Sequence, residues 1–438
     1  MIFGVPAAVI ASVILILSYA VLFSEKLNRA VAVMLGAAAM VLLGVLSYDQ
    51  ALKGIDFNTI ALLIGMMIMV GIMEKSGAFQ YAAVKSAKLV KANPRGILAV
   101  LGVVTAVLSA FLDNVTTVLL IVPVTIEITR KLKLNPYPFL LMEIFSSNIG
   151  GTATLIGDPP NILIGSALEL SFTDFLFHLT PVVLTIMAAV VGMFVYFWKD
   201  SLTTSLKNRA LVMNINEKDA ITDFKLLKKA LWVLGMVMAA FVVAHDIGFE
   251  NGFIALAGAA VMLLLYTMGL PHTQSDEKVE DVLRRVDWTT VFFFVGLFVI
   301  VGALDESGFL KKMGDYFVGV TGGSIKKSVY VILGVSAAAS AVVDNIPFVA
   351  TMIPTLKAME EALGGREAMM PVWWALSLGA CLGGNGTLIG ASANVIVAGI
   401  AAREGHPISF LRFLIWSVPV MLLSVAMAGV FLYLEYFI

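Results

Sequence analysis

Long apolar stretches separated by short polar segments run through the whole chain. A helix that crosses a bilayer needs about 20 predominantly apolar residues. By this measure, uninterrupted spans are predicted near 4–23, 30–47, 58–73, 172–198, 228–245, 251–268, 288–303 and 408–437. The pattern therefore predicts an all-α polytopic membrane protein.

Two apolar regions, 138–169 and 371–402, are too long and too interrupted to be one helix each. The first contains NIGGTATLIGDPPN (148–161), and the second contains CLGGNGTLIGASAN (381–394). Because glycine and proline disrupt helix interiors, each region is predicted to be a broken helix with a polar turn. Irregular backbone at membrane depth is tolerated only where protein or a water-filled cavity covers it, so both breaks are candidate ligand sites.

Two more apolar regions, 96–130 and 326–360, each contain one polar break, at Asp113-Asn114 and Asp344-Asn345. The arms that follow, 116–129 and 347–359, would extend roughly 20 Å as helices, against about 30 Å of hydrocarbon. Both regions are therefore predicted to be re-entrant helical hairpins whose tips lie near the middle of the membrane.

The two halves of the chain repeat the same elements in the same order. Asp56-Phe57-Asn58-Thr59 matches Asp287-Trp288-Thr289-Thr290, and the hairpin tips and broken helices also correspond. Each half would have five crossings, one of them broken, and one hairpin, and an odd number of crossings inverts the second copy. We expect a first repeat (1–198), a polar, irregular linker (199–227) and a second, inverted repeat (228–438). Inverted repeats are typical of secondary transporters, which bind substrate where broken helices meet.

The distribution of positive charge predicts the orientation. If the linker is cytoplasmic, alternation of the spans places most of the 29 Lys and Arg residues inside, as the positive-inside rule requires. The chain would then lie in the cytoplasmic membrane with both termini outside, one hairpin entering from the cytoplasm and the other from outside. Segments 78–91 and 308–320 have the spacing of amphipathic helices at the membrane surface.

Composition excludes several other classes of protein. The chain is 60% hydrophobic and 13% charged with a net charge of −1, so a nucleic-acid partner is not expected. A single cysteine, Cys381, cannot form an internal disulfide. Because we find no nucleotide-binding fingerprint and no metalloprotease motif, we expect neither an enzyme nor a cofactor. A channel is the other transport class, but breaks entering from opposite sides favour alternating access.

The acidic residues inside the apolar regions are the candidate proton carriers. Asp113 and Asp344 stand at equivalent hairpin breaks, and Glu143 lies within the first broken helix. A carboxylate at membrane depth is costly and is a functional candidate by default. The alternative is that the aspartates cap the helices that follow them.

Polar residues and glycines around the four breaks are the candidate substrate or ion ligands. They are Asn114, Thr116, Thr117, Asn148, Gly150, Gly151, Thr152, Thr154, Asp158 and Asn161 in the first half, and Asn345, Cys381, Gly383, Gly384, Asn385, Thr387 and Asn394 in the second. A Na+ site is expected near Asn114 and Asn148. Taken singly, each is more often a helix-packing group. We identify no lysine or arginine at a break.

Residues 147–161, SNIGGTATLIGDPPN, together with the paired Asp-Asn hairpins, resemble the ArsB/NhaD branch of the ion transporter superfamily. This branch includes arsenite efflux permeases, Na+/H+ antiporters and P-protein-like transporters. The resemblance implies a scaffold and a transport unit, a homodimer and an elevator-like motion. Distantly related dicarboxylate transporters have Ser-Asn-Thr motifs where this chain has Asp-Asn, a difference that favours proton coupling.

We therefore expect proton-coupled efflux of arsenite or antimonite, because neutral oxygens could bind the uncharged triol. A Na+/H+ antiporter and an anion/Na+ symporter are the alternatives. Expected partners are the transported ions, membrane lipid and a second copy of the chain, and an accessory cytosolic ATPase is left open.

Overall fold

The computed structural model describes residues 5–24, 26–244 and 247–438, and these residues are largely helical. In the first repeat the main helices are α1 (Ala7–Ser24), α2 (Arg29–Leu42), α4 (Phe57–Glu74), α5 (Ala78–Leu89), α6 (Pro94–Phe111), α7 (Asn114–Leu132), α8 (Tyr137–Gly151), α9 (Pro159–Ala167) and α10 (Phe172–Phe197). In the second they are α12 (Phe224–Val243), α13 (Asn251–Thr267), α15 (Trp288–Glu306), α16 (Phe309–Thr321), α17 (Ile325–Ser340), α18 (Asn345–Glu360), α19 (Arg366–Gly383), α20 (Ser392–Arg403) and α21 (Phe410–Tyr436).

These elements confirm the predicted order of spans, hairpin and broken helix in each repeat. The span predicted at 30–47 is shorter, because α2 ends at Leu42. The pairs α6/α7 and α17/α18 form the hairpins, and α8/α9 and α19/α20 form the broken helices. The amphipathic segments are α5 and α16. Residue 4, where the first span was expected to begin, and residue 245, where the sixth was expected to end, lie outside the described residues.

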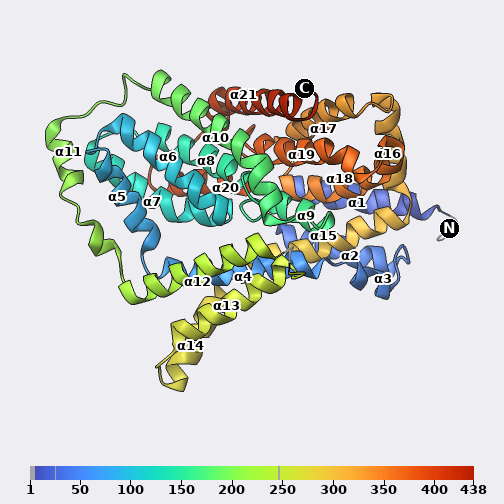
Figure 1. Cartoon of the computed structure of the whole chain (residues 1–438), viewed down its shortest axis with the longest axis horizontal. Helices are drawn as coiled ribbons and strands as arrows, with labels where there is room; N and C mark the ends of the chain where they lie inside the picture. The colour runs from blue at the N-terminus through green and yellow to red at the C-terminus, as the bar shows by residue number, and fades with distance from the viewer. Residues whose placement is uncertain (1–4, 25, 245–246) are drawn as a thin grey trace.

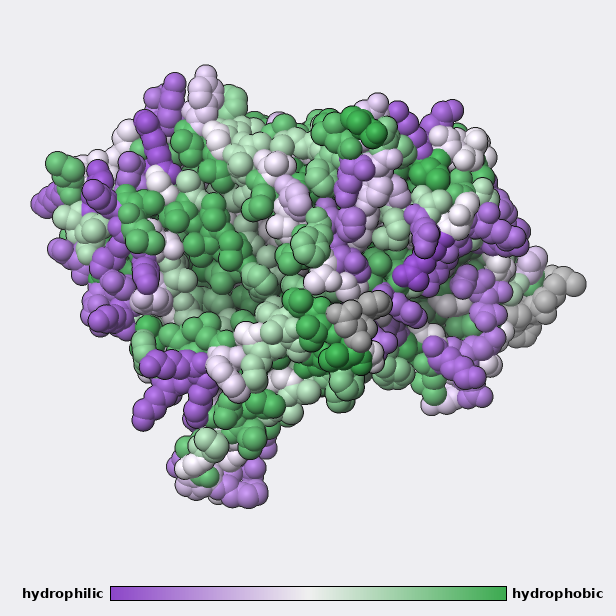
Figure 2. Space-filling view, viewed as in Figure 1, coloured by the Kyte–Doolittle hydropathy of each residue, from purple (hydrophilic) through white to green (hydrophobic). Residues whose placement is uncertain are grey.

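The helices form two groups (Figure 1). In one group, which we call the scaffold (α1, α2, α4, α12, α13 and α15), α2 packs on α15 and α4 packs on α13, so each pair joins the two repeats. In the other, which we call the hairpin group (α6–α10 and α17–α21), α6 packs on α8 and α17 on α19 within one repeat. Apolar side chains cover much of the middle of the molecule, and polar ones gather toward its ends (Figure 2).

The second hairpin arms are longer than the sequence predicted. We expected 116–129 and 347–359, but α7 has 19 residues and α18 has 16. Helix length therefore no longer argues against crossing by α7, which extends roughly 28 Å, whereas α18, at roughly 24 Å, is still shorter than the hydrocarbon. The position of the tip argues for re-entry instead, because the Ser109 hydroxyl donates to the Ser147 carbonyl at 2.7 Å and Thr154 donates to the Ala110 carbonyl. The first tip thus ends against the broken helix.

Two of the predicted ligand glycines have a packing role instead. A Cβ on Gly150 would lie 2.2 Å from the Ala106 carbonyl oxygen, and one on Gly383 would lie 2.6 Å from the Ala337 carbonyl oxygen. The glycines therefore allow α8 to pack against the backbone of α6, and α19 against that of α17, as small residues do in membrane helix pairs.

The prediction of an irregular linker is wrong. Residues 199–227 include α11 (Leu206–Met213) and a 3-10 turn (Glu217–Ala220). The Thr204 and Asn208 side chains donate to the carbonyl of Leu132 at the end of α7, and Glu217 pairs with Lys88 of α5. Short helices α3 (Tyr48–Lys53) and α14 (His272–Arg284) also occupy connections. The linker therefore follows the surface of the first hairpin.

Candidate functional site

A cavity of about 540 Å³ lies where the two hairpin tips meet the second halves of both broken helices. The N-termini of α7, α9, α18 and α20 line it through Asn114, Pro159, Asn345 and Ser392. Arg29 of α2 and residues of α4 and α15 close the scaffold side. Free backbone N–H groups at a helix N-terminus favour bound negative charge. At α7 and α18, Asp113 and Asp344 already accept from such groups, and α9 begins with two prolines that have no N–H, so α20 is the N-terminus that offers them.

Asp113 and Asp344 both line this cavity, and both also cap helices. Asp113 accepts a hydrogen bond from the Thr116 backbone N–H at 2.8 Å and another from the Thr116 hydroxyl. Asp344 accepts from the Ile346 N–H at 3.3 Å. The functional and capping interpretations are therefore compatible in the same side chains.

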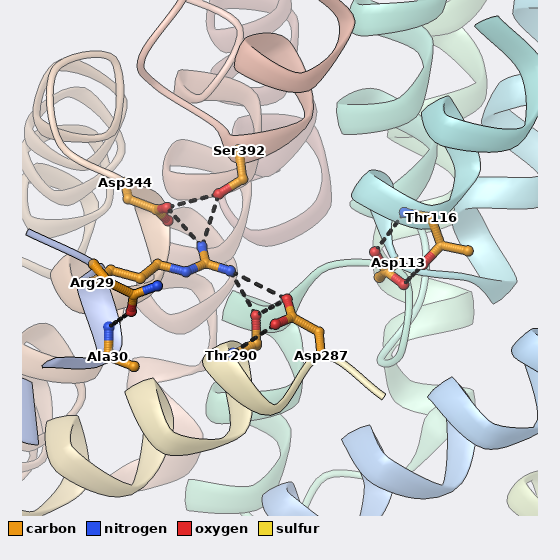
Figure 3. A network of polar contacts seen from close by, with 9 residues as sticks. Arg29, Ala30, Asp113, Thr116, Asp287, Thr290, Asp344 and Ser392 are labelled. Atoms are coloured by element: carbon orange, nitrogen blue, oxygen red, sulfur yellow. Dashed lines mark hydrogen bonds and ion pairs between the residues drawn. The ribbon is translucent and has the colours of Figure 1, made fainter. Parts of the chain in front are cut away.

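Arg29 links the scaffold to the second hairpin and the second broken helix (Figure 3). On one side its guanidinium donates to the Ser392 hydroxyl at 3.0 Å and lies 3.8 Å from the Asp344 carboxylate. On the other side it donates to the Thr290 hydroxyl at 2.6 Å and to Asp287 at 3.5 Å. Asp113 stands across the gap from this network, where it contacts Thr116 (Figure 3).

The expectation that no cation lies at a break is therefore wrong. Arg29 is far from both breaks in sequence, and only the pairing of α2 with α15 brings it there. The repeated motif that begins at Asp287 contains two members of this network. Asp287 and Thr290 lie at the N-terminus of α15, and both accept hydrogen bonds from Arg29. Arg285 and Glu74 also line the cavity and were not predicted.

The two broken helices present different groups to the cavity. At the N-terminus of α9, Asp158 is 1% exposed and accepts from the Asn345 amide at 3.3 Å. At the equivalent position of α20 stands Ala391, and among the residues the structure describes no side chain caps α20. Asp158 makes no hydrogen bond to the backbone of α9 either, so the two N-termini differ in charge and not in capping: a carboxylate stands at the first, and a methyl group stands at the second beside Arg29.

Asn161 and Asn394 hold the breaks together instead of lining the cavity. The Asn161 amide donates to the carbonyls of Thr152 and Thr154 at 3.0 and 2.9 Å, and its oxygen accepts from Ser377 of the other repeat at 2.6 Å. Asn394 likewise donates to the carbonyls of Gly384 and Thr387 at 2.8 and 2.9 Å. Each asparagine therefore fixes its own break.

Asn148 and Cys381 occupy equivalent places opposite these two asparagines. Asn148 donates to the side-chain oxygens of Asn385 and Asn394 at 2.9 and 3.0 Å, and the Cys381 thiol lies 3.6 Å from the Asn161 oxygen. Both side chains are buried in contacts between the repeats. This placement accounts for the asymmetry between the two positions without a ligand.

Of the predicted site residues, Asp113, Asn114, Thr116, Asp158, Asp344 and Asn345 meet in the cavity. The others are outside its lining: Glu143, Thr117, Asn148, Gly150, Gly151, Thr152, Thr154, Asn161, Cys381, Gly383, Gly384, Asn385, Thr387 and Asn394. Several have hydrogen bonds to backbone carbonyls; Thr152, for example, donates to the Asn148 carbonyl at 2.8 Å. The Na+ site near Asn114 and Asn148 stays a prediction.

Comparison with known sequences finds relatives along nearly the whole chain. An uncharacterized transporter of Mycobacterium tuberculosis is 41% identical over 435 residues, which cover 98% of this chain and 99% of the relative. The human P protein is 34% identical over 500 residues, covering 95% of this chain and 58% of the P protein. The chain therefore spans little more than half the length of the P protein.

A solved structure supports the fold. The crystal structure of the Alcanivorax borkumensis YdaH transporter, described as having an unusual topology, matches with a TM-score of 0.60 at 12% identity, covering 95% of this chain and 98% of that one. The family model described as "Citrate transporter" (CitMHS) matches residues 19–379. Consistent with the resemblance to the ion transporter superfamily, the chain belongs to the CitMHS citrate transporter family.

Proposed function

We propose that this secondary transporter carries a small carboxylate anion, of which citrate is an example, across the cytoplasmic membrane by alternating access with proton coupling. The observation that carries the proposal is Arg29 beside the uncapped N-terminus of α20. A guanidinium can bind a carboxylate through two parallel hydrogen bonds, and free backbone N–H groups at a helix N-terminus bind the same charge. A cavity of about 540 Å³ lies within the range of small-molecule sites.

The charges around the cavity support coupling to a cation. The acidic residues are Glu74, Asp113, Asp158, Asp287 and Asp344, and the basic residues are Arg29 and Arg285. An anion entering such a site is repelled unless positive charge enters with it. In our proposal, the substrate carboxylate displaces Asp344 from Arg29, and a proton enters the site with the anion to offset the added negative charge. Anion and proton then cross together.

This proposal differs from the arsenite efflux expected from the sequence. Arsenous acid is uncharged at neutral pH, so it would gain no charge–charge attraction from Arg29. The neutral amides that were expected to bind it, Asn148, Asn161 and Asn394, bond to each other or to the breaks. Arsenite and Na+ therefore become alternative outcomes of the test.

The experiment uses the full chain in proteoliposomes with an imposed inward proton gradient. In separate reactions, radiolabelled citrate is supplied outside, and arsenite or Na+ is loaded inside because antiport would move it outward as protons enter; an internal pH dye reports proton movement. We expect saturable citrate uptake that accelerates with the gradient and acidifies the lumen. If arsenite or Na+ discharges the gradient while citrate neither accumulates nor moves protons, the proposal is wrong.

A further inference from the structure

Glu143 is a buried carboxyl group that the proposed transport mechanism does not use. It lies on α8, is 0% exposed, and accepts one hydrogen bond, from Thr125 of α7, through Oε1. Its other oxygen, Oε2, has no hydrogen-bond partner among the described residues. Leaving a polar group unpaired in a protein interior is costly, and more so if the group is charged.

Glu143 does not stand alone in this interface. The hydroxyls of Thr105 on α6, Thr117 on α7 and Ser146 on α8 are also buried and find no partner within the described parts of the chain. Ser146 is three residues from Glu143 and therefore on the same face of α8. It also approaches α6, because a Cβ on Gly102 would come within 3.1 Å of its oxygen. The interior of the first hairpin thus contains several unsatisfied polar groups.

The second repeat packs the same helices without the carboxyl group, although Ser336, which aligns with Thr105, is again a buried hydroxyl with no partner among the described residues. In the alignment that pairs Asp113 with Asp344 and Gly150 with Gly383, Glu143 falls on Leu376, Thr125 on Leu356 and Ser146 on Gly379. Leu376 and Leu356 are both 0% exposed. The fold therefore has no need of a carboxyl group at this place, and its presence in one repeat alone points to a functional role.

The charged groups of the surrounding helices lie elsewhere. On the elements packed against α8 they are Arg95 of α6, Glu127, Arg130 and Lys131 of α7, Asp174 and His178 of α10, Arg366 and Glu367 of α19, Arg403 of α20, and Arg412 and Glu435 of α21. The described part of the chain shows none of them in an ion pair with Glu143. The Tyr137 hydroxyl, on α8 itself, donates to the Arg412 carbonyl and not to Glu143. A proton is therefore the simplest way to neutralise this carboxyl group.

We infer that Glu143 is a proton-binding site between α8 and the first hairpin, separate from the substrate cavity, and that the Thr105, Thr117 and Ser146 hydroxyls connect it to water. Thr117 is one turn from Asn114, which lines the cavity, so this hydroxyl is the one nearest to the cavity along α7. A buried water molecule typically forms about three hydrogen bonds to otherwise unsatisfied groups, and these hydroxyls and Oε2 of Glu143 are such groups. Glu143 then supplies a second site for the coupling ion, and this role rests on the proposed function.

The first test needs no substrate. Infrared difference spectra of the full chain in lipid nanodiscs are recorded across a pH series for the unmodified protein, Glu143→Gln and Thr125→Val. We expect a protonated-carboxyl C=O band that disappears in Glu143→Gln and shifts in frequency in Thr125→Val, because that hydroxyl donates to Glu143. A spectrum unchanged by Glu143→Gln at every pH would overturn the inference.

The second test measures coupling with radiolabelled citrate. Counterflow, which requires no net proton movement, is compared with uptake driven by a proton gradient. Because coupling between two ligands is commonly worth about 5–150-fold, we expect Glu143→Gln to retain counterflow and to lose about tenfold or more of the gradient-driven stimulation. Equal stimulation in Glu143→Gln would contradict a role in coupling.

A paired variant guards against misfolding. Glu143→Leu combined with Thr125→Leu reproduces the packing of Leu376 and Leu356 in the second repeat, so this variant should fold. It should also lack the carboxyl C=O band and lose the gradient-driven stimulation of citrate uptake. If the unmodified protein shows the Glu143 band but moves no citrate, the proposed substrate fails while the proton site stands.

Discussion

Arg29 offers the sharpest test of carboxylate transport. Its guanidinium nitrogen lies 3.8 Å from the Asp344 carboxylate, and both side chains are 29% exposed. At this separation the Coulomb attraction is about 4 kcal/mol for an effective dielectric constant near 20, before the cost of desolvation is subtracted. A substrate carboxylate that replaces Asp344 makes a comparable contact, so the net effect of Arg29 is that of one charged hydrogen bond, about 1.5–3 kcal/mol.

This magnitude predicts the kinetics. Arg29→Ala should raise the KM for citrate about 10- to 150-fold, since each 1.4 kcal/mol is a factor of ten. Arg29→Lys should give an intermediate loss, because one ammonium cannot contact both Ser392 and Thr290 as the two guanidinium nitrogens do. The measurement is the initial rate of radiolabelled citrate uptake in proteoliposomes as a function of concentration. Arg130→Ala is the matched control, because Arg130 pairs with Glu404 outside the cavity.

Competition between Asp344 and the substrate gives a second readout of the same prediction. Asp344→Asn frees Arg29 and should lower the citrate KM, and this gain should vanish in the Arg29→Ala background. The two single variants and the double variant form a double-mutant cycle, in which groups in direct contact commonly show interaction energies of about 0.5–3 kcal/mol. An Arg29→Ala variant that folds normally and keeps the citrate KM of the unmodified protein would refute the assignment of Arg29 to the substrate.

Three other substitutions test the structure around the cavity. Ala391→Asp places a carboxylate at the open N-terminus of α20, as Asp158 does at α9, and should abolish citrate binding measured by calorimetry while leaving the thermal midpoint in detergent nearly unchanged. Asn161→Ala removes four hydrogen-bonding contacts and should destabilise the protein by about 2–5 kcal/mol, seen as a lower midpoint; an unchanged midpoint would show that the break holds without it. Gly150→Ala should prevent normal folding, as judged by size-exclusion chromatography, whereas Gly192→Ala, which meets no atom within 4 Å in the described structure, should be tolerated.

The sequence predicted the repeat, the hairpins and the broken helices because each leaves a periodic or interrupted apolar pattern. It also identified the residues at both tips, since Asp113 and Asp344 interrupt apolar runs at equivalent positions. It could not identify Arg29, because the contact with Asp344 depends on packing between helices that are distant in the chain. For the same reason it could not distinguish ligands from structural groups. Asn161 lies in a polar break, as a ligand would, but its amide donates to backbone carbonyls.

The differences between the repeats, not their similarities, locate the chemistry. Two identical modules would present two equivalent helix N-termini to the cavity, and an anion would have two equal places to bind. The Asp158 carboxylate repels an anion from one of them, whereas Ala391 places no charge at the other, beside Arg29. In the same way Glu143 puts a carboxyl group between the first hairpin and its broken helix, while Leu376 stands at the equivalent place in the second repeat. If both differences are functional, the anion binds toward the second repeat and the extra proton in the first, so exchanging either pair of residues between repeats should move or abolish one function without disturbing the fold.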